Sequence, residues 1–193
     1  MFFLSKPSRE SIGAFISGQR DQPFSYPHVG ASRERAPSTY AVDHHRVQLG
    51  QGDVVFARAV KAVTQWSMFD MPWIHLCWPD TPIQAGATVA VLVSHLGFWS
   101  LNACRIVYVI EEHGMCEKYG FAYGTLPQHR EIGEERFTVE FQSDDQSVWY
   151  DIYALSRPGP VAKLGYLYAR ILQKRFARDS IRSMMKVVNE ASL

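Results

Sequence analysis

The feature that most constrains this chain is its last long segment, Pro160 to Asn189, which carries one uninterrupted helical pattern. Mostly apolar side chains recur there at four-residue steps, and a basic row runs parallel to them, offset by two residues. Two residues turn an α-helix by about 200°, so the two rows lie on opposite faces. The apolar row is Leu164, Tyr168, Leu172, Phe176, Ser180 and Met184, and the basic row is Arg170, Lys174, Arg178, Arg182 and Lys186. The rest of the chain must therefore cover one face of a long helix.

A series of segments with a period of two precedes this helix and supplies the cover. They are rich in Val, Ile, Tyr, Phe and Trp, as β-strands are. Parallel strands need connections of about a dozen residues, whereas turn-like breaks such as His113-Gly114 are short, so we expect an antiparallel meander. The predicted strands are Trp73–Trp78, Thr88–Leu96, Leu101–Glu112, Lys118–Thr125, Glu134–Gln142 and Ser147–Ser156.

The first third of the chain adds one strand and two helices. Ser8 is a suitable cap for a short helix over Arg9–Gln19. Residues 23–39 are rich in proline and serine and predict a surface loop, after which Tyr40–Leu49 reads as a strand. From Asp53 to Phe69 the apolar residues follow helical spacing, so we expect one amphipathic helix.

These elements predict an α+β fold in which a curved antiparallel sheet of about seven strands wraps around the long C-terminal helix. This helix-grip arrangement buries the apolar row of the helix and leaves room for a cavity between helix and sheet. The length of 193 residues suits a single domain, 1–193. We divide it into an N-terminal helical extension (1–22), a loop (23–39) and the helix-grip core (40–193).

Composition excludes several classes of function. The chain is 47% hydrophobic and 20% charged with a net charge of +1, which does not favour a nucleic-acid partner. It shows neither a signal peptide nor a transmembrane segment, so we expect a cytoplasmic protein. The cysteines Cys77, Cys104 and Cys116 lack metal-ligand or disulfide spacing and fit reduced thiols. We predict no metal site and no cofactor, since nucleotide and metalloprotease motifs are missing.

Several stretches resemble the family catalogued as domain of unknown function 1990. The resemblance covers nearly the whole chain from about Phe24. It implies a helix-grip shape like that of START proteins and the birch-pollen allergen, and it supplies no catalytic residues. The stretches are Phe24-Ser-Tyr-Pro-His-Val-Gly30, Leu96-Gly-Phe-Trp-Ser-Leu-Asn-Ala-Cys-Arg105 onward to Ile110, Gly120-Phe-Ala-Tyr-Gly-Thr-Leu-Pro127, Gly133-Glu-Glu-Arg-Phe137, Val148-Trp-Tyr-Asp151, and the tail from Ser156-Arg-Pro158 through Arg175-Phe-Ala-Arg-Asp-Ser180.

Two charged residues interrupt apolar strand faces. Glu135 shares a face with Phe137, Val139 and Phe141. Arg105 shares one with Ala103, Val107 and Val109. A lone buried ion is costly, so each needs a partner. They pair with each other, address a bound ligand, or lie at exposed strand ends, and the sequence leaves these alternatives open.

Further candidates for a binding site are aromatic or titratable. His95 ends a predicted strand, where it suits the mouth of a cavity as a structural residue or as an acid or base. Tyr123 belongs to an aromatic strand face whose opposite side is nearly without side chains. Trp149 and Tyr150 are candidates as core residues or as walls of an apolar pocket. On the last helix, Tyr168 is expected to face the sheet as part of the cavity wall, and Arg175, near the edge of the apolar row, to reach a polar group inside.

Three functions are compatible with these residues. The first is binding of a small hydrophobic or amphipathic molecule in a cavity between sheet and helix, with Arg105 and Glu135 as polar anchors. The second is a cofactorless enzyme that uses the same cavity, with His95, Tyr123 or Glu135 transferring protons. The third is an interaction protein that binds an anionic partner through the basic helix face. The pattern does not fix an oligomeric state.

Overall fold

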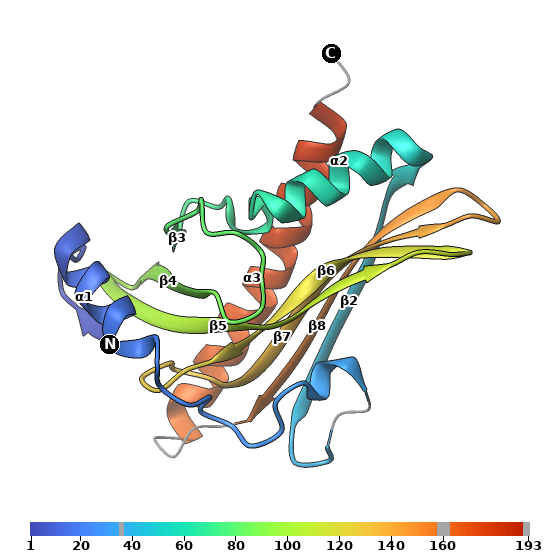
Figure 1. Ribbon diagram of the computed structural model, residues 1–193. Helices are drawn as coiled ribbons and strands as arrows, with labels where there is room; N and C mark the ends of the chain where they lie inside the picture. Colours follow the sequence, from blue (N-terminus) through green and yellow to red (C-terminus); the bar gives the residue numbers. More distant parts are fainter. Residues whose placement is uncertain (35–36, 158–162, 191–193) are drawn as a thin grey trace.

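The protein is built on an eight-stranded antiparallel sheet that curves around a long helix (Figure 1). A computed structural model describes residues 1–34, 37–157 and 163–190. Seven strands follow the order β2-β8-β7-β6-β5-β4-β3, and β1 pairs with β5. The strands are β1 (Phe2–Phe3), β2 (Ala41–Gln51), β3 (Ile74–Cys77), β4 (Thr88–His95), β5 (Phe98–Glu112), β6 (Cys116–Thr125), β7 (Ile132–Gln142) and β8 (Ser147–Arg157). The helices are α1 (Arg9–Gln19), η1 (Ala31–Arg33), α2 (Asp53–Thr64), η2 (Ser67–Phe69) and α3 (Lys163–Glu190), where η marks a 3-10 turn.

The predicted fold class is confirmed. In Figure 1, α3 runs across the concave side of the sheet, and α2 crosses α3 near the C-terminal end of α3. All strand pairs are antiparallel, as the short connections predicted. Pro160, the expected start of the last helix, lies outside the described residues.

The apolar row of α3 provides the contact with the sheet. Ser180 and Met184 are fully buried, and the Tyr150 hydroxyl on β8 lies 2.9 Å from the Ser180 hydroxyl. Phe176 packs against Phe69 and Phe137. The hydroxyl groups of Ser180 in this row and of Tyr150 on β8 therefore satisfy each other within the contact between helix and sheet.

The helix predicted over Asp53–Phe69 is shorter than expected. α2 ends at Thr64 because Trp66 takes the left-handed conformation, with φ at 58°, which no continuous α-helix tolerates. This turn buries Trp66, and the chain continues as η2, whose Met68 and Phe69 are also buried. Apolar spacing alone did not reveal the break.

The sequence did not predict strand β1, because a segment of two residues is too short to show an alternating pattern of apolar and polar side chains. It fits where it does because β5 is longer than its neighbour β6. Pairing with β6 begins at Cys104, so the stretch from Phe98 has a free edge on that side, and Phe2–Phe3 pairs with Trp99 and Ser100.

The convex side of the sheet has a core of its own under α1. Ser8 caps α1, as predicted, by accepting a hydrogen bond from the Ser11 amide at 3.2 Å. Ile12 and Phe15 in α1 are buried with Leu92 on β4 and Leu101 on β5. The N-terminal extension therefore packs on the outside of the sheet and leaves the concave side to α2 and α3.

Candidate functional site

A cavity of about 220 Å³ lies between the concave face of the sheet and α3. Its apolar walls come from both layers, with Phe69, Trp73, Ile74, Val91, Val93, Ile152, Leu172, Phe176 and Ala177 among them. Polar side chains also line it: Asp43, His45, His95, Asn102, Tyr123, His129, Arg130, Glu131, Glu135, Tyr168 and Gln173. An apolar space with a few converging polar groups is the usual form of a small-molecule site.

One row of residues across the sheet forms the floor of this cavity. The strand register places Tyr123 on β6 opposite Glu135 on β7, Glu135 opposite Ala154 on β8, and Ala154 opposite Asp43 on β2. All four line the cavity. Because Ala154 has only a methyl group, the row has a gap between the carboxyl groups of Glu135 and Asp43.

Glu135 is the central polar group of this row. The Tyr123 hydroxyl donates a hydrogen bond of 2.8 Å to its Oε2 atom. Burial raises the pKa of the Glu135 carboxyl to about 8; the hydrogen bond from Tyr123 opposes the shift, and the charges of Glu131 and Asp43 add to it. The Glu135 carboxyl is therefore largely protonated at neutral pH.

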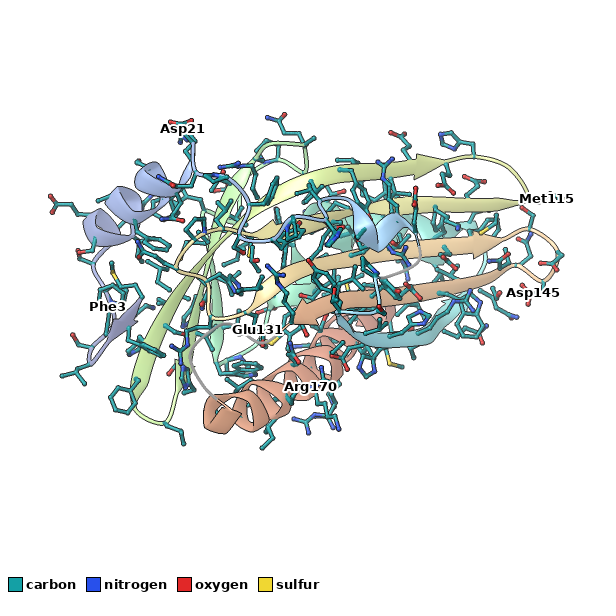
Figure 2. The ribbon with its side chains drawn as sticks, turned by 90° about the horizontal axis from the view of Figure 1, so that it is seen from below. Phe3, Asp21, Met115, Glu131, Asp145 and Arg170 are labelled. Atoms are coloured by element: carbon teal, nitrogen blue, oxygen red, sulfur yellow. The ribbon has the colours of Figure 1, made fainter. Side chains whose placement is uncertain are left out.

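A second carboxyl with a raised pKa is contributed by Glu131, just before β7. Burial raises the pKa of Glu131 to about 7, while a hydrogen bond with Gln173 and the charge of Arg170 act in the opposite direction. Nearby, burial lowers the pKa of His129 to about 4, so this imidazole is neutral at pH 7. In Figure 2, Glu131 lies close to α3, on the side where Arg170 is labelled.

Asp43 and Arg170 form an ion pair at the edge of the cavity. The Nη2 atom of Arg170 on α3 lies 2.6 Å from Oδ1 of Asp43, and its Nη1 atom binds Oδ2. Nη1 also donates to Gln173 at 2.8 Å. A bidentate contact of this kind fixes orientation as well as charge, and here it joins α3 to the edge strand β2.

Four of the residues predicted for the site come together in the cavity: Glu135, Tyr123, His95 and Tyr168. The Tyr168 hydroxyl lies 3.3 Å from Nδ1 of His95, and the two rings are 5.7 Å apart. Burial, and then the charge of Arg130, lowers the pKa of His95. His95 is the last residue of β4, as expected.

Arg105 does not reach this group, and the predicted pair with Glu135 is not formed. Its Nη2 atom donates to the carbonyl of Gln19 at 3.0 Å and to that of Arg20, at the C-terminal end of α1. A register shift between Ile106 and Tyr108 changes the alternation of β5, so Val109 packs into the concave core although strict alternation groups it with Arg105. Arg105 therefore fastens α1 on the convex side.

The other three candidates also lie away from the cavity lining. Trp149 faces outward under the guanidinium of Arg46, at 4.2 Å from the ring centre. Tyr150 is a fully buried core residue bonded to Ser180. Arg175 stacks on the Trp73 ring at 4.4 Å and pairs with Asp179 at 3.5 Å, on the outer side of α3.

The basic face of α3 is partly neutralised by its own helix. Arg178 lies 3.0 Å and Arg182 3.6 Å from the same carboxyl oxygen of Asp179. Lys186 lies 4.0 Å from Glu190. Among the described helices, none is both long and apolar enough to cross a membrane.

The side of β6 without large side chains does not face a ligand site. A Cβ atom on Gly124 would meet the Tyr26 hydroxyl at 2.0 Å, so the loop before η1 occupies this space. The same hydroxyl donates to Glu134 at 2.7 Å, and the amides of Gly30 and Ser32 donate to Glu134 at 2.7 and 2.9 Å. Glu134 is thus a buried anchor for this loop on the convex side, while its neighbour Glu135 faces the cavity.

Sequence reasoning missed Asp43, His129, Glu131 and Gln173 as members of the site. Asp43 alternates with His45 and Val47 on the inner face of β2, and this period was available in the sequence. His129 and Glu131 lie in the connection between β6 and β7, where no regular alternation of side chains predicts which way each side chain points. Gln173 lies one residue after Leu172 in the apolar row of α3, at the border of the buried face.

Comparison with known proteins agrees with this fold. A protein of Dictyostelium discoideum called UPF0548 is 35% identical over 208 residues, with 97% of this chain and 96% of that protein covered. One of the same name from Deinococcus radiodurans is 34% identical, with 96% and 98% covered. A solved structure of a hypothetical protein from Helicobacter pylori superposes with a TM-score of 0.53 at 11% identity, covering 86% and 96%. The family model described as "Domain of unknown function (DUF1990)" matches residues 25–183, and the chain belongs to this family.

Proposed function

We propose that this protein binds a small amphipathic molecule in the cavity between the sheet and α3. The observation that carries the proposal is the cavity itself: about 220 Å³ with apolar walls and a polar floor. A ligand that matches the shape of an apolar cavity gains dispersion contacts with its walls. The polar row that contains Tyr123 and Glu135 would then orient the head of the ligand.

The proposal is tested with a variant that fills the cavity from its floor. Ala154→Leu places a larger side chain in the gap between Glu135 and Asp43. We expect it to remain folded and to lose binding of N-phenyl-1-naphthylamine, a neutral fluorescent probe. Val42→Leu is the matched control, because Val42 is exposed on the same edge strand as Asp43 and points away from the cavity. Equal probe binding by both variants would contradict the proposal.

Native mass spectrometry of protein purified without denaturation is the complementary measurement. A retained small molecule in the wild-type protein and in Val42→Leu, but not in Ala154→Leu, supports binding inside the cavity. If no mass is retained and the fluorescent probe does not respond, the proposed function is wrong.

A second candidate function, acid–base catalysis in the same cavity, is favoured by one observation. The carboxyl group of Glu135 has a pKa of about 8 and a hydrogen bond from Tyr123, so it is available to transfer a proton near neutral pH. The two functions are separated by incubating the retained ligand with fresh protein. A change of ligand mass that Glu135→Gln abolishes indicates catalysis, and an unchanged mass indicates binding alone.

A further inference from the structure

We propose that the cavity selects a cationic head group, so that its ligand is an amphipathic amine held by Glu131 and Glu135. This inference rests on the proposed function and specifies its ligand class. It starts from the arrangement of charged groups around one apolar space. The cavity lining includes four acidic residues. The Glu134 carboxylate is bound by Tyr26 and by the amides of Gly30 and Ser32, which leaves the carboxyl groups of Asp43, Glu131 and Glu135.

The arginines nearby already have partners. Arg170 is engaged by both carboxyl oxygens of Asp43 and by Gln173. The guanidinium of Arg130, a residue of the cavity lining, stacks on the Phe2 ring at 4.1 Å. Neither arginine forms an ion pair with Glu135 among the contacts of the described residues.

Glu135 lines the cavity and has a carboxyl oxygen without a protein partner among the described residues. Tyr123 occupies its Oε2 atom, and the Oε1 atom has no hydrogen bond among the residues that the structure describes. The Glu135 side chain is only partly exposed and lines the cavity. A donor from the ligand would complete this carboxyl group, since buried polar atoms in folded proteins are almost always hydrogen-bonded.

The electrostatics favour a charged donor over a neutral one. Without a ligand, burial and the mutual repulsion of the carboxyl groups keep protons on Glu135 and partly on Glu131, because both have raised pKa values. An ammonium group compensates the charge of the ionised carboxylates directly, and it forms hydrogen bonds about twice as strong as neutral ones. An anionic head group would add to the repulsion.

Two histidines of the cavity lining, His95 and His129, favour the neutral form. Burial lowers the pKa of His129 to about 4, and burial with the charge of Arg130 lowers the pKa of His95. His45 also lines the cavity from β2; it lies two residues after Asp43 and pairs with Ile152. Glu134, the remaining acid at this end of β7, is occupied on the convex side by Tyr26 and the amides of the η1 segment.

The test compares three probes with one apolar chain and different heads: octylamine, octan-1-ol and octanoate. Each competes with N-phenyl-1-naphthylamine for the cavity at pH 7.5. We expect octylamine to displace the fluorescent probe at a concentration at least about tenfold below that of octan-1-ol, a factor equivalent to 1.4 kcal/mol, with octanoate the weakest. If octylamine competes no better than octan-1-ol, whether both displace the probe or neither does, the inference is wrong.

The pH dependence provides a second criterion. An ammonium group replaces a proton on the carboxyl pair, so the affinity for octylamine should rise from pH 6 to pH 8, by at most about tenfold per unit for one released proton. The affinity for octan-1-ol should stay constant or fall. An octylamine affinity that does not rise over this range contradicts the inference.

Variants then assign the preference to particular residues. Glu135→Gln and Glu131→Gln should each reduce the preference of octylamine over octan-1-ol by about tenfold while octan-1-ol still binds. Glu140→Gln is the matched control, because Glu140 lies on the same strand and pairs with Arg46 at 2.9 Å on the convex side. An unchanged preference in both cavity variants overturns the inference. Loss of binding for all three probes and for the fluorescent probe in the wild-type protein would instead overturn the proposed function.

Discussion

Arg170 in α3 binds both carboxyl oxygens of Asp43 in β2, although 127 residues separate the two in the sequence. The pair connects the first half of α3 to an edge strand of the sheet beside the cavity. Both side chains are about one-fifth exposed, at 23% and 18%. Because the pair is largely shielded from water, the loss of one partner leaves a poorly solvated charge and is costly.

The first prediction concerns this ion pair. Arg170→Met should lower the free energy of unfolding by about 2 kcal/mol, because a partly buried carboxylate loses its cation. Urea denaturation measures the effect, and Arg178→Met, which removes an exposed arginine of the same helix, should stay within about 0.5 kcal/mol of the wild type. Combining Arg170→Met with Asp43→Asn should restore part of the loss. Equal effects of the two arginine variants would contradict the prediction.

The second prediction concerns the pH dependence of stability. The pKa of Glu135 is raised from 4.5 to about 8 in the folded protein, so between these values the folded state binds more protons than the unfolded state. Stability contributed by this group is therefore present at low pH and is lost as pH rises to about 8. We expect the stability of Glu135→Gln relative to the wild type to increase by up to about 3 kcal/mol from pH 5 to pH 8.

Unfolding by urea at four pH values measures this difference. Glu131→Gln should show a smaller increase, because the pKa of Glu131 is raised only to about 7. A constant difference between Glu135→Gln and the wild type across the range would show that Glu135 is ionised in the folded protein at neutral pH.

The third prediction separates Arg105 from the cavity. Arg105→Met removes the donor to the carbonyl groups of Gln19 and Arg20, so it should lower the free energy of unfolding by about 1–2 kcal/mol. Hydrogen exchange should accelerate at the C-terminal end of α1. Binding of N-phenyl-1-naphthylamine should not change, and weaker binding by a folded Arg105→Met protein would place Arg105 in the ligand site after all.

The fourth prediction concerns Glu134, which is 3% exposed. Its carboxylate accepts hydrogen bonds from Tyr26, from the amides of Gly30 and Ser32, and from the Ser32 hydroxyl. Glu134→Ala should cost about 3 kcal/mol or more, because it leaves several buried donors without an acceptor. Thermal and urea unfolding check the value. Glu134→Gln, which keeps one acceptor oxygen, should cost less, and the reverse order would contradict this account.

The strand alternation correctly predicted the position of two side chains. It placed Glu135 on the same face as Phe137, and His95 at the end of a strand, because side-chain direction in a regular strand follows from position alone. It did not show that Arg105 lies outside the cavity: Ala103 on the same face packs on the convex side, and the register shift after Ile106 turns Val109 inward instead. A bulge depends on the pairing partner, which the sequence of one strand does not reveal.

The sequence by itself determined the class of the fold: an apolar row along 28 residues of α3 requires cover, and successive short-linked strands can supply only an antiparallel sheet. Only the tertiary structure decided which polar residues meet. Tyr123, Glu135 and Asp43 form one row because the strand register aligns β6, β7, β8 and β2, and Glu131 joins them from a connection without a period. The raised pKa values likewise arise from burial by elements distant in the sequence, since desolvation depends on what surrounds a carboxyl group in space.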